Sequence, residues 1–245
     1  MGIMAIRGIL LDVDGTLVLS NDAQARAWVE AFTAHGHDVP LEKVRPLIGM
    51  GGDKVVPDLA PGLNDKEGTG KEIADARKKL MLETFGPTLQ PAPGSRELVQ
   101  RARQEGLAIV VASSASSEEL EMLLNVARVD DLRRERTTMD DAGESKPAPD
   151  IVSVALTKSG LGADEVVMIG DSPYDIESAE KIGVGTIALR CGGFSDDDLT
   201  GALALYDDPA DLLARYDASP LRKASRPAGA EVRGESTPDM DEGGI

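Results

Sequence analysis

The chain has 245 residues, of which 43 are acidic and 26 basic, so its formal net charge at pH 7 is −17. This charge argues against nonspecific nucleic-acid binding, because few cations are left to replace the counterions of a phosphate backbone. One cysteine, Cys191, and two histidines exclude an internal disulfide and argue against a zinc site. Oxygen ligands and a hard cation such as Mg²⁺ remain as the metal chemistry open to the chain.

No apolar run approaches the roughly 20 residues that a membrane-spanning helix needs, and the N-terminus lacks the pattern of a leader peptide. We therefore expect a soluble, cytoplasmic protein without a membrane partner, either a monomer or a homodimer. The length suits one large domain or two smaller ones.

The first predicted element is a buried strand, Arg7 to Asp12, which is built from branched apolar residues and ended by Gly15. It leaves Asp12 and Asp14 at its C-terminal end, where open α/β sheets bind ligands. Side chains two residues apart on a strand lean the same way, so both carboxylates can address one site. Two like charges this close repel unless they share a cation or one is protonated. The pair therefore indicates a magnesium site with a nucleophile and a general acid.

Residues 20–90 show helical periodicity without strands, with turn-rich sequence at both borders. We expect an all-helical insertion, which could act as a lid over the catalytic edge or be a static excursion that adds core. Inside it, a glycine-rich turn ends in Lys54, and Lys54 and Arg45 are candidate substrate-binding cations; two solvated cations beside a flexible turn are the alternative. The predicted helices span residues 23–35, 41–48, 54–59 and 66–85.

After residue 90, strands and helices alternate, which predicts a Rossmann-like, doubly wound α/β fold with a parallel sheet. From residue 217 onward Pro, Gly, Ser and charged residues predominate, so we expect a disordered tail over residues 217–245. The predicted strands span residues 107–113, 136–139, 166–170, 185–190 and 202–206, and the predicted helices span 95–104, 117–127, 149–159, 174–182 and 210–216.

Three further motifs lie along this alternating region. Ser113 and Ser114 end a strand and could donate hydrogen bonds to a phosphoryl group, although helix capping also explains such serines. Lys146 precedes two prolines that start a helix; it could balance several carboxylates and a phosphate, or be a solvated surface lysine. Asp171 repeats the position of Asp12 at the end of another strand, with Asp175 four residues later; a helix-capping aspartate is the alternative.

As a set, DVDGTL at residues 12–17, the strand-end serine, SKPAPD at 145–150 and GDSPYD at 170–175 resemble the motifs of the haloacid dehalogenase superfamily of phosphohydrolases. The resemblance covers residue 6 to about residue 216. It implies that Asp12 is the nucleophile, that Asp14 is the general acid/base, and that Asp171 binds Mg²⁺ together with the Asp12 carboxylate and the Asp14 carbonyl. It also implies that Asp175 supports the metal site. The implied phosphate-binding residues are Gly15, Ser113, Ser114 and Lys146.

The same resemblance implies a helical cap, here residues 20–90, on an α/β core of residues 1–19 and 91–216. Asp14 disfavours the dehalogenase and phosphonate-cleaving branches, which lack a second aspartate at that position. Phosphoglucomutase-like relatives carry a cap histidine soon after the first motif, where this chain has Asp22 to Arg26 without histidine. The implied enzyme is a Mg²⁺-dependent phosphatase that forms an aspartyl-phosphate, in the phosphoglycolate phosphatase and β-phosphoglucomutase-like branch.

The implied substrate is a small phosphorylated metabolite, with phosphoglycolate as the nearest specific candidate. A sugar-phosphate phosphatase or phosphomutase of the same family and a non-catalytic binding or regulatory relative remain alternatives. A receiver-type signalling domain is disfavoured, because its phosphoacceptor lies on an interior strand and it has no insertion of roughly 70 residues after the first strand.

Overall fold

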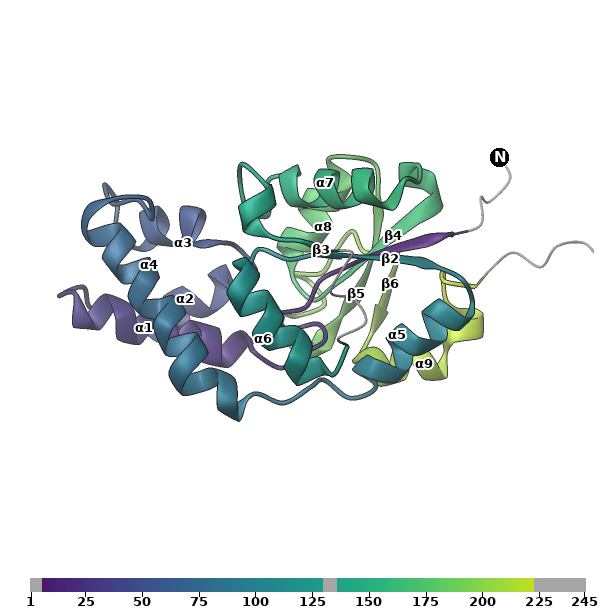
Figure 1. The fold of residues 1–245 in the computed structure, drawn as a ribbon, viewed down its shortest axis with the longest axis horizontal. Helices are drawn as coiled ribbons and strands as arrows, with labels where there is room; N and C mark the ends of the chain where they lie inside the picture. Colours follow the sequence, from purple (N-terminus) through teal and green to yellow (C-terminus); the bar gives the residue numbers. More distant parts are fainter. Residues whose placement is uncertain (1–5, 130–135, 223–245) are drawn as a thin grey trace, which may run out of the picture.

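The computed structural model describes residues 6–129 and 136–222. These residues form a six-stranded, wholly parallel sheet with helices on both faces, and a helical module lies beyond one end of it (Figure 1). The strand order is β3-β2-β1-β4-β5-β6. The predicted doubly wound α/β fold is therefore confirmed. The strands are β1 (Gly8–Leu11), β2 (Ala108–Ala112), β3 (Arg136–Thr137), β4 (Val166–Gly170), β5 (Gly185–Leu189) and β6 (Ala204–Tyr206).

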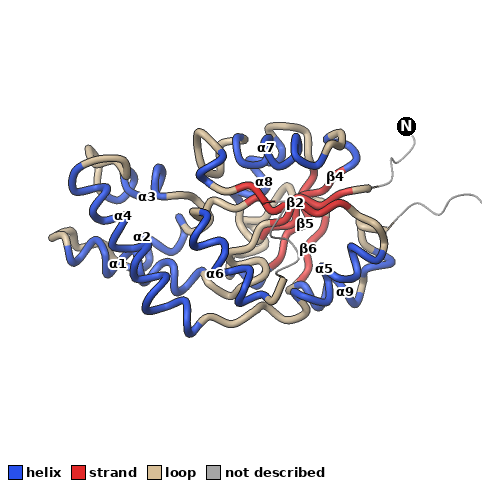
Figure 2. The backbone as a smooth tube through the Cα atoms, viewed as in Figure 1, coloured by secondary structure: helices blue, strands red, loops and turns tan. Residues whose placement is uncertain are grey.

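The central strand β1 is buried on both faces because its apolar side chains alternate between two clusters. Ile9 and Leu11 join one cluster and Leu10 joins the other. Three helices cover the first cluster: α5 (Ser95–Gln104), α6 (Ser117–Ala127) and α9 (Pro209–Ala214). Two helices cover the second, on the opposite face (Figure 2): α7 (Asp150–Ser159) and α8 (Pro173–Glu180).

The sheet reverses its winding direction between β1 and β4. The chain moves outward from β1 to β2 and β3, then returns to place β4 on the other side of β1. The loops after β1 and β4 therefore diverge, and this switch point is where open α/β sheets bind ligands.

The helical insertion, which we call the cap, has a hydrophobic core of its own that includes Trp28, Phe32 and Ile73. Its two linkers run side by side, since Leu19 N–H donates to the Gln90 carbonyl at 3.0 Å. The separate core agrees with the expected division into 1–19 plus 91–216 and 20–90, which stays a prediction. The cap elements are α1 (Asn21–Ala34), α2 (Leu41–Val44), η1 (Arg45–Leu47), α3 (Gly52–Leu59), α4 (Gly68–Leu80), η2 (Met81–Phe85) and η3 (Gly86–Thr88).

The predicted tail begins later than expected. Tyr216–Ala218 forms a 3₁₀ turn and Leu221 packs into the main core at 1% exposure, so the expectation of disorder is wrong for residues 217–222. One leucine in an otherwise polar stretch of sequence was too weak a signal to predict that residues 217–222 pack against the core. Residues 223–245 lie outside the described part of the chain. None of the helices described combines the length and hydropathy that a membrane crossing requires.

Candidate active site

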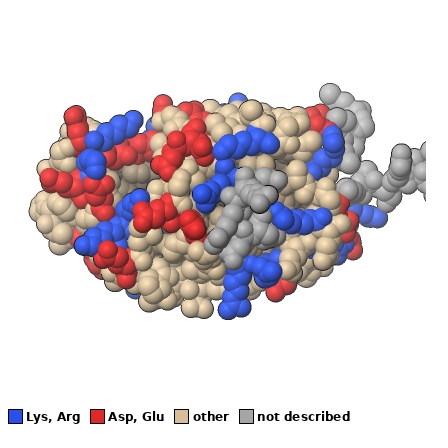
Figure 3. All heavy atoms as spheres, in the orientation of Figure 1, with Lys and Arg blue, Asp and Glu red and all other residues tan. Residues whose placement is uncertain are grey.

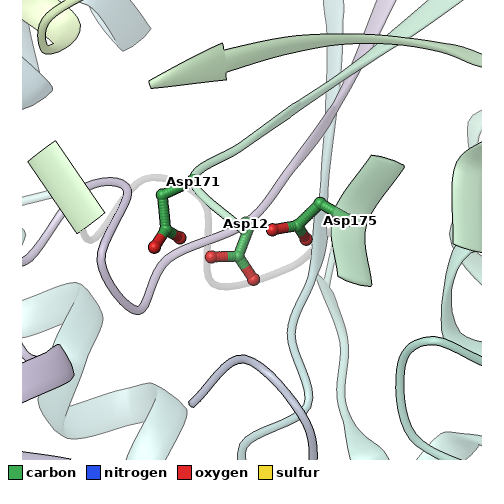
Figure 4. Close-up of side chains that lie close together, drawn as sticks. All are labelled: Asp12, Asp171 and Asp175. Atoms are coloured by element: carbon green, nitrogen blue, oxygen red, sulfur yellow. The ribbon is translucent and has the colours of Figure 1, made fainter. Parts of the chain in front are cut away.

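Three buried carboxylates meet at the switch point of the sheet. Asp12 follows β1 directly, Asp171 follows β4, and Asp175 lies in the first turn of α8. One carboxylate oxygen from each lies within 4.8 Å of the others. The Asp12 carboxylate lies between those of Asp171 and Asp175 (Figure 4). Such a group is unstable without cationic compensation, because each charge has been removed from water beside two like charges.

Lys146 supplies part of that compensation. Its side chain is 1% exposed, which excludes the solvated-lysine alternative, and Nζ donates to Asp12 Oδ1 at 2.6 Å and to Asp175 Oδ1 at 2.7 Å. Burial alone would lower the pKa of Lys146, but the two carboxylates outweigh burial and raise it, so the amine stays charged. Ser172 fixes the other oxygen of Asp175 through its hydroxyl at 2.7 Å.

The gap between Asp12 and Asp171 fits a second cation. Thr16 Oγ1 lies 3.1 Å from Asp12 Oδ2 and 3.0 Å from Asp171 Oδ1, yet its single proton can serve only one of the two. Burial, opposed in part by Lys146, raises the pKa of Asp12 well above its ordinary value. Burial and the Asp175 charge raise the pKa of Asp171 to about 7. Oxygen ligands under this repulsion are a donor set suited to Mg²⁺.

Asp14 occupies a different environment from the three-carboxylate group. Ser20 Oγ and Gln24 Nε2 both donate to its Oδ1, at 2.6 Å and 2.8 Å. Burial outweighs these hydrogen bonds and raises the pKa of Asp14. A carboxyl group that holds its proton more tightly than usual, and that unlike Asp12 accepts no hydrogen bond from Lys146, matches a general acid.

Asp12 and Asp14 line one cavity of about 330 Å³ between the cap and the core. On the face shown in Figure 3, the surface is hollowed between these two parts. Ser113 and Ser114 line the same cavity from the core, as expected. Ser113 Oγ accepts from the Ala115 N–H at 3.1 Å, whereas Ser114 Oγ donates to the cap carbonyl of Gly49 at 3.3 Å.

The cap lies closed on the core through its glycine-rich segment, residues 49–52. Gly51 N–H donates to Ser145 Oγ at 2.9 Å, beside the Ser114 contact with Gly49. The Tyr174 hydroxyl donates to the Pro46 carbonyl at 2.7 Å. Side chains of the second, third and fourth motifs therefore contact the cap as well as the site.

Gly15, expected to bind phosphate, does not line the cavity in this structure, and that role stays a prediction. Its N–H donates inside the loop, to the Val18 carbonyl at 2.8 Å and to Ser20 Oγ at 3.2 Å. Gly15 has φ +71°, and a Cβ there would lie 2.2 Å from Asp171 Oδ2. Glycine is therefore needed at this position because the loop passes close to Asp171.

The two cations expected to bind the substrate lie away from the cavity in this structure, and their role stays a prediction. Neither Lys54 nor Arg45 lines the 330 Å³ cavity. Lys54 pairs with Glu144 of the core. Arg45 pairs with Asp22 at 2.8 Å, donates to the Gly192 carbonyl, and lies over the ring of Phe194. The sequence showed that Lys54 and Arg45 are charged and lie near a glycine-rich turn, but it did not specify the direction in which these long side chains point.

The cap residues that line the cavity include several that were not anticipated, among them Trp28 and Gln24 on α1, and Arg77 and Lys78 on α4. The sequence around Arg77 and Lys78 is typical of a solvated helix face, because it is rich in lysine and arginine. Their position depends on how α4 packs against α6, which no local pattern specifies.

The chain matches the family described as haloacid dehalogenase-like hydrolase over residues 9–189. It is 31% identical over 192 residues to Protein SUPPRESSOR OF QUENCHING 1, chloroplastic, of Arabidopsis thaliana; the aligned part is 76% of this chain but 18% of that much longer protein. It is 24% identical over 192 residues to pyrophosphatase PpaX of Bacillus cereus, covering 76% of this chain and 84% of the relative.

Solved structures give the same relationship. A hydrolase from Pseudomonas syringae superposes with a TM-score of 0.80 at 28% identity, covering 86% of this chain and 98% of that one. CbbY from Rhodobacter sphaeroides, in complex with phosphate, superposes with a TM-score of 0.67 at 27% identity, covering 84% and 96%. A β-phosphoglucomutase and two proteins described as phosphoglycolate phosphatases share the fold at lower identity. With most of its length inside the family match, the chain belongs to the haloacid dehalogenase-like hydrolases and is an enzyme of that family.

Proposed function

We propose that this phosphatase hydrolyses the monoester of a small phosphorylated metabolite through an aspartyl-phosphate on Asp12, with Mg²⁺ as cofactor. One observation carries the proposal: Asp12 is held by Lys146 beside Asp171 and faces the same cavity as Asp14. A carboxylate that accepts a hydrogen bond from an ammonium and a second, proton-retaining carboxyl group are the nucleophile and the acid that phosphoryl transfer requires.

In the first step, an oxygen of Asp12 forms a bond to phosphorus while the bond from phosphorus to the ester oxygen breaks. Asp14 gives its proton to the departing oxygen, which leaves as an alcohol. In the second step, a water oxygen attacks phosphorus, its proton passes to Asp14, and the bond between phosphorus and Asp12 breaks to release inorganic phosphate. Ser113 and Lys146 are the side-chain donors we assign to the transferring phosphoryl group.

We assign Mg²⁺ to the carboxylates of Asp12 and Asp171 with the backbone carbonyl of Asp14, and assign Asp175 the supporting role of holding Lys146. When bound, the ion would offset the negative charge that the nucleophile and the phosphoryl group share. The bridging position of the Thr16 hydroxyl between Asp12 and Asp171 supports this assignment, since one proton cannot satisfy both carboxylates.

Hydrolysis is favoured over a phosphomutase reaction by the residue beside Asp14. Gln24 donates to the Asp14 carboxyl group at 2.8 Å from α1. Its amide can orient that group but has no titratable proton to exchange with a sugar hydroxyl. Phosphoglycolate, expected from the sequence, and pyrophosphate, suggested by the name of the Bacillus relative, are the first specific substrates to test.

The decisive experiment measures phosphate release from p-nitrophenyl phosphate, with Mg²⁺ and with excess EDTA, for the wild type and Asp12→Asn. We expect turnover only for the wild type with Mg²⁺. Glu30→Gln, which removes an exposed charge on α1, controls for the handling of variants. Failure of the wild type to turn over any monoester would contradict the proposal and favour a binding or regulatory role.

A further inference from the structure

The charged residues that line the cavity do not suit a leaving group with a negative charge of its own. Beyond Asp12 and Asp14, its charged lining residues are four acids and two bases. The bases are Arg77 and Lys78, both on α4. The acids are Asp65, Asp75, Glu119 and Asp140.

Both bases are already paired with acids at the start of α6. Arg77 forms an ion pair with Glu119, whose side chain is 4% exposed, and also donates to the Gln24 side chain. Lys78 Nζ lies 3.0 Å from Glu118 Oε2. Because a close carboxylate cancels most of a cation's field, neither base offers an unpaired charge to a substrate anion.

Arg77 nevertheless retains a hydrogen-bond donor. Among the described residues, its buried Nε has no hydrogen-bond partner, and its guanidinium carbon lies 5.3 Å from the centre of the Trp28 ring. A buried, unsatisfied N–H is costly, and a hydroxyl oxygen of a bound molecule would satisfy it without bringing charge.

Asp65 adds negative charge at the cap side of the cavity. It lines the cavity, and partial burial together with the nearby Asp53 raises its pKa. A carboxylate in this position accepts hydrogen bonds from hydroxyls and repels a second anion.

We infer that the enzyme selects phosphate monoesters whose leaving group carries hydroxyls but no second negative charge, such as polyol or sugar monophosphates, and that Glu119 sets this preference by neutralising Arg77. The inference rests on the proposed function, and within it disfavours phosphoglycolate and pyrophosphate, because the leaving group of each carries a second negative charge. A cavity of about 330 Å³ is at the small end of ligand pockets, which agrees with a leaving group of a few carbons. Glu119 is a specificity-determining residue in this scheme and takes no part in the chemical steps.

The test compares kcat/KM for glycerol 3-phosphate and 3-phosphoglycerate. The first carries a neutral hydroxymethyl group at the position where the second carries a carboxylate. We expect the wild type to prefer glycerol 3-phosphate by about tenfold or more, a factor equivalent to about 1.4 kcal/mol. Glu119→Gln keeps a side chain that can cap α6 but unpairs Arg77, so the preference should fall by about tenfold. Glu30→Gln, which removes one exposed charge on α1, should leave the ratio unchanged.

Asp65→Asn gives an independent variant if Glu119→Gln fails to fold, and it should move the ratio in the same direction. A wild type that prefers 3-phosphoglycerate, or a ratio that no cavity variant moves, would overturn the inference. Turnover of p-nitrophenyl phosphate separates the two claims: its absence contradicts the proposed function, whereas its presence with the wrong charge preference contradicts only the selection rule.

Discussion

Ser20 and Gln24 donate to the same oxygen of Asp14, and this shared contact turns the carboxyl group of Asp14 into the cavity. We expect Asp14→Asn to lower kcat/KM for an alkyl phosphate by about 100-fold or more, since general acids typically contribute 10²- to 10⁴-fold. The loss should be smaller for p-nitrophenyl phosphate, because nitrophenolate leaves without a proton. Steady-state kinetics on both substrates check this expectation.

An equal loss on both substrates would instead assign Asp14 a role in binding or in folding. Gln24→Glu is a useful companion variant. It adds a negative charge beside Asp14, which should raise the pKa of Asp14 further and shift the alkaline limb of the kcat/KM–pH profile upward, because the general acid must be protonated.

Asp171 links the stability of the metal-free protein to pH. Burial and Asp175 raise the pKa of Asp171 from 3.8 to about 7, so between these values the native state binds more protons than the unfolded state. The stabilising contribution of this group is complete below about pH 4 and is lost as the pH rises through about 7. In EDTA, we expect Tm to fall more between about pH 5 and pH 8 for the wild type than for Asp171→Asn.

Thermal melts with Mg²⁺ complete that test. Because Mg²⁺ binds the ionised carboxylates, it should raise the Tm of the wild type at about pH 8 and have little effect on Asp171→Asn. Identical pH dependence in the two proteins would show that another group dominates the linkage.

At the scale of elements, the loop after β1 must pass close to Asp171. Gly15 and Gly36 both have positive φ, at 71° and 79°, but only at Gly15 would a Cβ meet another residue, 2.2 Å from Asp171 Oδ2. Alanine at either position should cost about 1–2 kcal/mol of stability from left-handed backbone strain. Only Gly15→Ala should also abolish Mg²⁺-dependent phosphate release, which urea unfolding and activity assays separate.

Should Gly36→Ala lose as much activity as Gly15→Ala, backbone strain alone would explain the effect. A selective loss in Gly15→Ala would locate the effect at the contact with Asp171.

The elements that carry the core of the site could be predicted because most motif residues follow a strand or begin a helix. Parallel strands place their carboxyl ends at one edge, so Asp12 and Asp171 meet there, whereas Lys146 reaches Asp12 from the turn before α7. The cap offered no such rule. Arg77 reaches the cavity and Lys54 does not because of how the cap helices pack on the core, and the sequence pattern of a helix face does not contain that information.

At the scale of the whole molecule, the last described residues pack against the main hydrophobic core through Leu221. This side chain joins the cluster that contains Leu212 and Tyr216. We expect Leu221→Ala to lower the free energy of unfolding by about 2–5 kcal/mol, the usual cost of truncating a buried leucine. A chain ending at Arg222 should keep the wild-type stability if the sequence-based prediction for residues 223–245 holds. Chemical denaturation of the three proteins distinguishes these outcomes.

A result in which Leu221→Ala is neutral would mean that the C-terminal segment packs weakly in solution. Destabilisation of the shorter chain would contradict the prediction of a disordered tail.

The glycine-rich segment of the cap has a kinetic consequence. The seam between cap and core includes hydrogen bonds from Gly51, Ser114 and Tyr174, and a typical protein hydrogen bond contributes about 1 kcal/mol net. Opening the cap must break these hydrogen bonds together with the ion pairs of Lys54 with Glu144 and of Arg77 with Glu119, so product release requires several contacts to separate at once. A side chain added at Gly49, where Cβ would meet Ser172 Oγ at 2.8 Å, would keep the cap from closing fully on the core.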